Sequence, residues 1–353
     1  MTPLPHELYS RFARRKVIFL LASLAALAAI SMLAVFVGGA RLTMGEMMRA
    51  MIGMLPFVHV EIDPGTAAIV QHLRLPRIVM AMLAGAGLAI AGGVMQGALR
   101  NPLVSSFTMG VASGAALGAS LAIILGFSMV GPERYMVIVN AFIFALGTTL
   151  LILALGRLRG VTPESFILVG IALLFFFGAV TSTLQYVATE EELAAVIHWA
   201  FGTLTGSAWE NILIVLAVQV ICLPLLIKYS WDLNTMASGG DEVATSLGIN
   251  CGRVRVMVMV LAALITATII SFTGIIGFVC LVAPHITRLL IGSDHRFLLP
   301  GAALVGATLL LAADTIGRTV FSPVIIPVGI VISFVGAPFF FFLLMSRRRA
   351  GWQ

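Results

Sequence analysis

The sequence predicts an all-α, polytopic membrane protein with about ten transmembrane helices. Of its 353 residues, 60% are hydrophobic and only 10% are charged, whereas an ordinary soluble domain carries about 25% charged residues. Glycine, proline and charge clusters divide the apolar residues into long runs, and each span needs about 20 of them. We therefore expect a single transmembrane domain over residues 1–353, with little chain left for a separate soluble domain.

The breaks between the apolar runs define ten candidate spans. They cover residues 16–38, 66–98, 107–126, 135–155, 163–187, 207–229, 253–272, 275–292, 297–317 and 324–346. A basic cluster precedes the first run, which is longer than the apolar core of a signal peptide. We interpret this run as a first span that is retained.

The basic residues predict the topology of these spans. With the basic cluster at residues 11–16 in the cytoplasm, 15 of the 21 lysines and arginines lie on the inner face and 6 on the outer face. This bias places both termini inside, together with the N-terminal segment 1–15, the loop 230–252 and the tail 347–353. Because these loops hold the positive charge, we expect contact with membrane lipid and no nucleic-acid partner.

Three segments have patterns of their own. The glycines between residues 85 and 93 let helices approach closely, so we expect the second span in the middle of the bundle. Four methionines between residues 44 and 51 recur at helical spacing. They predict an amphipathic helix lying on the bundle, with a copper or haem site as the alternative. The acidic residues 190–192 predict the start of a short helix at the outer mouth.

The residues that several other functions require are missing. Neither lysine, Lys16 or Lys228, ends a G-x-x-x-x-G-K-[ST] loop, so the chain has no nucleotide-binding P-loop of its own. The three cysteines are widely separated and the histidines lack H-x-x-x-H spacing, so we predict no disulfide framework, metal site or hydrolase site. The acidic residues lie near span ends or in loops, which disfavours ion-coupled transport.

The remaining polar patterns lie at the two membrane faces. On the outer face, Arg74 and Arg77 lie about one helical turn apart, and Arg318 ends the ninth span. These arginines either pair with carboxylates of an external protein or snorkel to the interface. On the inner face, residues 100–103 form a gate or a plain turn, and residues 241–248 form an amphipathic stretch that docks on a partner or stays solvated.

Taken in order, these patterns resemble the permease subunit of type II ABC importers, the family that carries iron chelates, haem and cobalamin. The resemblance runs from about residue 60 to 345. It rests on Arg74-Leu75-Pro76-Arg77, the glycine-rich run ending in Gln96, Arg100-Asn101-Pro102-Leu103, Trp199-x-x-Gly202-Thr203-Leu204, Glu242-x-Ala244-x-x-x-Gly248, Gly277-Phe278, Pro284-His285-x-x-Arg288, Asp294-His295-Arg296, Ala313-Asp314 with Arg318, Pro327-x-Gly329 and Gly336-Ala337-Pro338. One departure is Cys280, where the family usually has glycine, and it concerns local packing.

The resemblance implies a type II ABC importer fold and a homodimer whose pathway lies at the dimer interface, lined by the fifth and tenth spans. Two separate ATPase subunits below would bind ATP and Mg, and a substrate-binding protein would dock above. This chain would hold no cofactor or metal and would carry out no catalysis. Such a complex belongs in the inner membrane of a bacterial cell, or in the cell membrane of an archaeon.

The resemblance also implies roles for individual residues. Binding-protein docking would fall on Arg74, Arg77 and Arg318. Coupling to the ATPase subunits would fall on Asp241, Glu242, Ala244, Leu247 and Gly248. The cytoplasmic gate would consist of Asn101 and Leu103, with Pro163 and Glu164 at a second constriction where the cobalamin relative has small hydroxyl residues.

We therefore predict an importer permease that moves a bulky iron chelate, such as a siderophore or haem, or a cobalamin-like substrate into the cytoplasm. Iron chelate comes first because it is the commonest cargo of the family, which is an argument by analogy. An importer of the oxyanions molybdate or tungstate with the same fold is the alternative. An ion-coupled secondary transporter and a membrane protein that binds haem through His and Met are further competitors.

Overall fold

The computed structural model describes residues 5–38, 43–53, 62–127, 129, 135–158 and 162–346, and the regular elements within these ranges are helices. This confirms the all-α class. In chain order the helices are α1 (Pro5–Phe36), α2 (Met44–Ile52), α3 (Pro64–Ala68), η1 (Ile69–Arg74), α4 (Leu75–Ala98), α5 (Val111–Leu125), α6 (Met136–Leu158), α7 (Pro163–Val187), α8 (Glu190–Ala200), α9 (Trp209–Lys228), α10 (Ser230–Ser246), α11 (Cys251–Thr273), α12 (Val279–Ile291), α13 (His295–Gly317) and α14 (Val328–Ser346).

The ten predicted spans correspond one for one to apolar helices of the structure. Within the described ranges, seven helical segments are long and apolar enough to cross a membrane: α1, the continuous α3–η1–α4 segment, α6, α7, α9, α11 and α13. Three shorter apolar helices, α5, α12 and α14, supply the remaining three. The chain is therefore a multi-pass membrane protein.

These three shorter helices begin later than the sequence predicts. The expected starts were residues 107, 275 and 324, and the helices begin at Val111, Val279 and Val328. Gly110 (φ 76°) and Phe278 (φ 61°) take positive φ angles directly before α5 and α12, which interrupts regular helix there. With 13 residues, α12 is about 20 Å long, shorter than the roughly 30 Å hydrocarbon core.

The second span departs from regular α-helix just ahead of Pro76. Residues Ile69–Arg74 form a π-helix, and the backbone N–H of Leu75 donates to the carbonyl of Val70, five residues back. A proline ring collides with the carbonyl four residues earlier in an α-helix, so the wider turn accommodates Pro76. The π-helix ends at Arg74 and so determines where this arginine lies.

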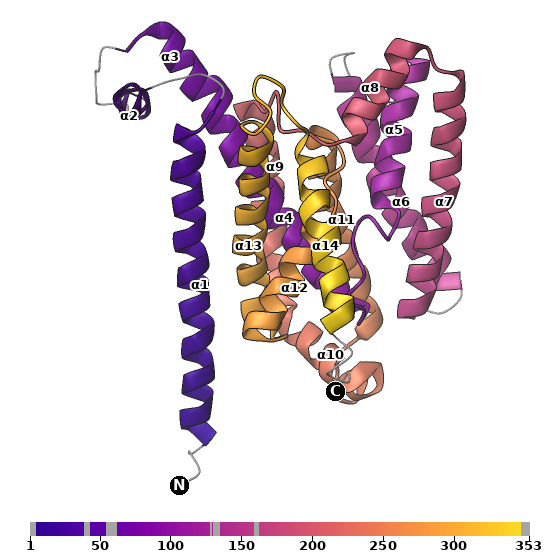
Figure 1. The fold of residues 1–353 in the computed structure, drawn as a ribbon. Helices are drawn as coiled ribbons and strands as arrows, with labels where there is room; N and C mark the ends of the chain where they lie inside the picture. The colour runs from indigo at the N-terminus through magenta and orange to yellow at the C-terminus, as the bar shows by residue number, and fades with distance from the viewer. Residues whose placement is uncertain are drawn as a thin grey trace.

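The bundle has α4 and α11 at its centre. These two spans are the most buried, whereas α1 and α7 are the most exposed and lie at opposite edges of the molecule (Figure 1). A Cβ atom added to Gly92 would lie 1.7 Å from the carbonyl oxygen of Cys280 on α12. One added to Gly85 would lie 2.3 Å from the carbonyl oxygen of Gly306 on α13. These close approaches confirm that the glycine-rich second span packs inside the bundle.

The two ends of the bundle carry different elements. The start of α1, the end of α14 and all of α10 lie at the lower end in Figure 1, whereas α2, α3 and α8 lie at the upper end. The segment 230–252, expected as a loop, is mostly the helix α10, kinked at Gly240 (φ 74°, ψ 179°). The short outer helix predicted from the acidic run is confirmed as α8, which begins with a capping box formed by Thr189 and Glu192.

Candidate functional site

The three arginines predicted to dock a partner converge at the outer end of α13, around Asp314. The Arg77 Nη2 atom lies 2.8 Å from Asp314 Oδ1, and Arg77 Nε donates to both carboxylate oxygens at 2.9 and 3.1 Å. The Nε atom of Arg318 lies 3.7 Å from Asp314 Oδ2. Asp314 is only 1% exposed, so its charge is neutralised mainly by these arginines rather than by water.

Two of these arginines also hold the outer end of α1. Arg74 donates from Nη1 to the carbonyl of Val35 at 2.8 Å, and Arg318 donates from Nη2 to the carbonyl of Ala34. The last carbonyls of a helix have no partner within the helix, and cations stabilise them. Both arginines are buried, at 5% and 7% exposed. Arg74 and Arg318 therefore bind inside the molecule in this structure, and Arg77 is the least buried of the three.

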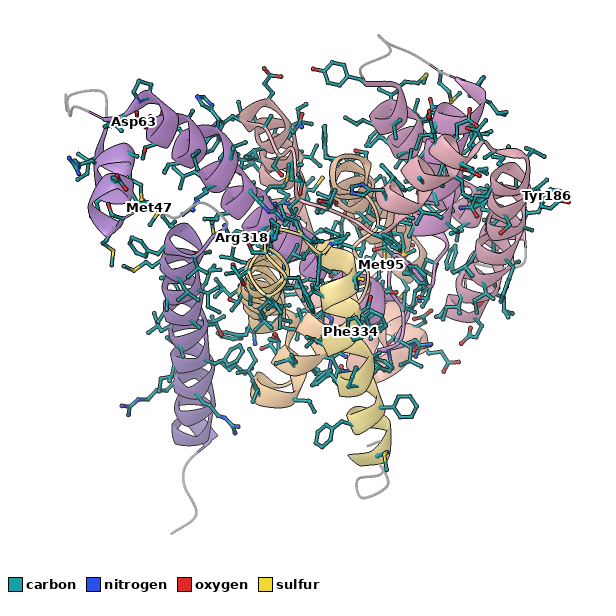
Figure 2. The ribbon with its side chains drawn as sticks, turned by 45° about the horizontal axis from the view of Figure 1, so that its top comes forward. Met47, Asp63, Met95, Tyr186, Arg318 and Phe334 are labelled. Carbon is teal, nitrogen blue, oxygen red and sulfur yellow. The ribbon has the colours of Figure 1, made fainter. Side chains whose placement is uncertain are left out.

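The arginine cluster borders an outer cavity of about 1000 Å³. Arg74, Arg77 and Arg318 all line it, together with Thr205, Trp209 and Glu210 among others. Figure 2 shows Arg318 on the side of α13 that faces α1. Arg77 and Arg318 share one buried carboxylate and Arg74 lines the same cavity, so the cluster has an excess of positive charge toward the cavity. This arrangement suits the docking of an acidic side chain.

A second cavity, of about 810 Å³, lies against α14 and is almost entirely apolar. Its lining includes Phe107, Phe201, Phe278 and Phe334, and its polar side chains are hydroxyls only: Ser105, Thr108 and Ser333. Phe334 is largely exposed, and Figure 2 shows its place on α14. The tenth span, α14, lines this cavity, and no described lining residue comes from the fifth span, α7. That these two spans line a pathway at a dimer interface stays a prediction.

The four predicted gate residues fall into two separate places. Asn101 and Leu103 share the turn after α4, where the Leu103 N–H donates to Asn101 Oδ1 at 2.9 Å and the Leu103 side chain is exposed. Pro163 and Glu164 form the first turn of α7, with the proline buried and the glutamate exposed. Among the described residues, no hydrogen bond or ion pair joins the two places, so their common role stays a prediction.

The predicted coupling residues form the second part of α10. Asp241 pairs with Arg255 at 2.9 Å, and Arg255 Nε donates to the carbonyl of Ala98 at 3.0 Å, which attaches α10 to α11 and α4. Ala244 is fully buried. Glu242 and Leu247 are exposed, and Gly248 turns the chain with a φ of 86°. The segment therefore exposes one acidic and one apolar side chain, while the contacts of Arg255 hold α10 against α11 and α4.

Asp294 joins three helices at the inner end of the bundle. It accepts hydrogen bonds from Lys16 of α1 at 3.2 Å, Asn234 of α10 at 2.9 Å, and Arg296 at 2.7 Å. Burial alone would raise the pKa of Asp294, but these hydrogen bonds outweigh it and hold the pKa well below its ordinary value. The Arg296 guanidinium also stacks over the Trp231 ring, 4.1 Å from its centroid.

Three residues that hold the structure together, Asp314, Arg255 and Asn234, were not predicted to have a role. Asp314 had a signal, because an acid four residues before Arg318 on a helix allows an ion pair. No local sequence pattern pointed to Arg255 or Asn234, because their partners come from other helices. His285 is buried within α12 beside Pro284.

The sequence comparisons agree with this geometry. Residues 26–346 match the family model described as the FecCD transport family. The chain belongs to the FecCD transport family. An ABC transporter permease protein of Methanocaldococcus jannaschii is 42% identical to this FecCD chain, over 96% of this chain and 97% of that protein.

Other relatives are named for their cargo. The cobalamin import permease of Halobacterium salinarum is 41% identical, over 80% of this FecCD chain and 75% of its own length. The Fe(3+)-citrate import permease of Bacillus subtilis is 39% identical, over 82% and 85%. A solved metal-chelate type ABC transporter in an inward-facing conformation superposes with a TM-score of 0.80 at 34% identity, covering 93% of this chain and 98% of that one. The chain is an ABC importer permease with the type II fold.

Proposed function

We propose that the chain is the membrane subunit of an importer that moves a bulky metal chelate, with an iron chelate as first choice, from a binding protein into the cytoplasm. Haem and cobalamin-like cargo belong to the same proposal. The observation that carries it is the apolar cavity beside α14, whose lining residues include aromatic rings and hydroxyls but no charged side chain. Such a lining suits a large ligand that must be released rather than held.

The alternative cargo is an oxyanion, because a molybdate import permease of Haemophilus influenzae is also a relative. A small dianion is bound by cations and N–H donors. The cavity beside α14 offers hydroxyls alone, whereas the arginines line the outer cavity. This difference favours the chelate over the oxyanion.

The energy source in this proposal is ATP hydrolysis by two partner ATPase subunits, which also hold Mg. Glu242 and Leu247 of α10 would contact them, and two copies of this chain would form the pathway between them. Closing of the ATPase pair would then move α10, which Arg255 ties to the bundle. Such nucleotide-driven motion is a rigid-body switch.

Affinity purification from the native membrane in mild detergent, followed by mass spectrometry, tests this assembly. We expect a co-eluting subunit with a P-loop in equal amount. The complete complex is then reconstituted in liposomes, with the ATPase subunits facing the lumen and the binding protein outside. These liposomes should accumulate the iron chelate only when ATP is present in the lumen. Uptake by the chain alone without ATP would instead establish an ion-coupled secondary transporter, and uptake of molybdate alone would establish the oxyanion importer.

Docking of the binding protein is best tested at Arg77, because Arg74 is buried and also holds α1. Because Arg77 also pairs with the buried Asp314, affinity is compared only for protein that elutes as a folded, monodisperse peak in size-exclusion chromatography. We expect Arg77→Glu to weaken binding on the order of 30-fold or more, as loss of a desolvated charge pair costs about 2 kcal/mol or more. Arg49→Glu, an exposed outer arginine on α2, is the matched control and should leave affinity unchanged. Equal affinity for the Arg77→Glu variant and the native chain would remove this role from Arg77.

A further inference from the structure

The helix α2 exposes an apolar arc that no other part of the described chain covers. Met44, Met48 and Met51 are 63%, 47% and 37% exposed, and Ile52 beside them is 38% exposed. Their spacing places them on one face of the helix. Leu73, on the neighbouring η1, is 64% exposed as well. Exposed apolar side chains gathered in this way mark an interaction surface.

Contacts on the adjacent side of α2 show which part of the helix faces the bundle. Met47 and Ala50 are buried, with Met47 Sδ 3.2 Å from Arg74 Nη1 and the Ala50 carbonyl accepting from Gln71 Nε2 at 3.3 Å. The methionine arc therefore cannot turn inward, and the sequence-based expectation that these methionines lie on the bundle holds only for Met47.

The remaining side of α2 is charged. It carries Glu46 and Arg49, and Thr43 caps the helix through a capping box with Glu46. Hydrogen bonds from Thr43 hold the pKa of Glu46 below its ordinary value, so this side stays ionised near neutral pH. The helix thus separates an apolar arc from a charged arc.

The helix α2 lies close to the end of the first span, α1. Only seven residues, 37–43, connect the end of α1 to the start of α2, a reach of at most about 25 Å at about 3.3–3.6 Å per residue. Figure 1 shows α2 nearly end-on beside the upper end of the upright α1, so the two axes cross. At the outer end of α1, Met32 and Leu33 are also exposed, at 64% and 55%.

We propose that α2 is an interfacial helix whose methionine arc lies in the outer leaflet of the lipid bilayer. The helix α2 contacts α1 near the end of that span where apolar side chains are exposed, and helices with one apolar and one charged side lie in the interface with their apolar side buried. Unbranched methionine side chains adapt to a fluid surface. Through Met47 and Arg74, α2 also sets the height of the arginine cluster above the membrane.

Site-directed fluorescence on the full chain in lipid nanodiscs tests this proposal. A polarity-sensitive label is attached to Met48→Cys on the apolar arc, and to Arg49→Cys on the charged arc as the matched control. The native cysteines are buried, and the chain without an added cysteine measures their background labelling. Size-exclusion chromatography verifies that both variants are folded.

We expect nitroxide-labelled lipid to quench the label at residue 48 at least about twofold more than the label at residue 49, since interfacial helices bury their apolar side about 5–10 Å deep. Aqueous iodide should show the reverse order. Stronger iodide quenching at residue 48 would overturn the proposal in favour of a solvated helix. Protection of residue 48 from both quenchers would overturn it in favour of a protein partner, and quenching of the label by added Cu(I) alone would favour a methionine metal site.

Discussion

At the scale of single residues, buried or half-buried charges in the described part of this protein pair near the ends of spans. Asp314 meets Arg77 and Arg318 at the outer end of α13, and Asp294 meets Lys16 and Arg296 at the inner end. A buried ion costs several kcal/mol unless a partner compensates for its lost water. Breaking one of these pairs should therefore destabilise the protein, even though replacing a whole pair by apolar side chains need not.

Asp314→Asn should destabilise the protein strongly. The substitution leaves Arg77 and Arg318 desolvated without a carboxylate, and removing one partner of a buried pair typically costs about 3–5 kcal/mol. We expect a decrease in Tm in detergent of several degrees, on the order expected for such a change. Glu210→Gln, an exposed acid lining the same outer cavity, is the control and should leave Tm nearly unchanged. Equal Tm values for the two variants would contradict this account.

Asp294→Asn should destabilise the protein in a pH-dependent way. The pKa of Asp294 is lowered in the folded state, so the unfolded chain takes up the proton more readily and protonation favours unfolding. The stabilisation is present above the unfolded pKa of about 4 and is lost as the pH falls toward the folded value. The difference in Tm between native chain and variant should be constant from pH 8 to about 5 and shrink below about pH 4. A difference in Tm that grows as the pH falls would contradict a lowered pKa of Asp294 in the folded protein.

At the scale of elements, glycines allow the central helices to touch. The backbone of α4 meets α12 at Gly92 and α13 at Gly85, without any side chain in between. In a membrane the lipid tails are as apolar as the helix surfaces, so close packing and polar contacts hold helices together. The inner attachment of α10 to α11 through Asp241 and Arg255 follows the same rule.

Gly92→Ala should prevent correct folding. Its Cβ atom would lie 1.7 Å from the Cys280 carbonyl oxygen, so α4 and α12 would have to separate. We expect loss of the monodisperse peak in size-exclusion chromatography of a fluorescent fusion. Gly147→Ala on α6 is the matched control, because nothing lies within 4 Å of its new methyl group. That control should keep the native yield and gain up to about 1 kcal/mol from helix propensity.

At the scale of the whole molecule, the two ends of the bundle carry different elements and different candidate sites. One end carries α2, α3, α8 and the arginine cluster, and the other carries α10 together with the start of α1 and the end of α14 (Figure 1). The excess of basic residues in the loops of the second end supports a cytoplasmic orientation for it. The apolar cavity beside α14 belongs to the bundle between them.

This orientation predicts which introduced cysteines are reached from outside the cell. Tyr186 near the end of α7 is 91% exposed, and Trp231 at the start of α10 is 62% exposed. A membrane-impermeant maleimide should label Tyr186→Cys in intact cells, and Trp231→Cys only after permeabilisation. The reverse pattern would mean that α10 faces outward, which would exclude it from contact with cytoplasmic ATPase subunits.

The sequence by itself determined the all-α class, the number of spans, the missing P-loop and the membership in an importer family. These features depend on composition, on the length of apolar runs and on motifs read along the chain. The late starts of α5 and α12 escaped prediction, because apolar residues continue through a backbone break without any change in hydropathy.

The tertiary structure alone decided how the polar residues are used. Arg74 and Arg77 look alike in the sequence, yet Arg74 binds the end of α1 while Arg77 pairs with Asp314 across 237 residues. The π-helix ahead of Pro76 and the packing of α13 bring about this difference. Likewise, four methionines of one short helix divide into a buried Met47 and an exposed arc. Which side chains are buried, and which charges pair between distant helices, depends on where the neighbouring helices lie. The spacing of residues along one segment does not contain that information.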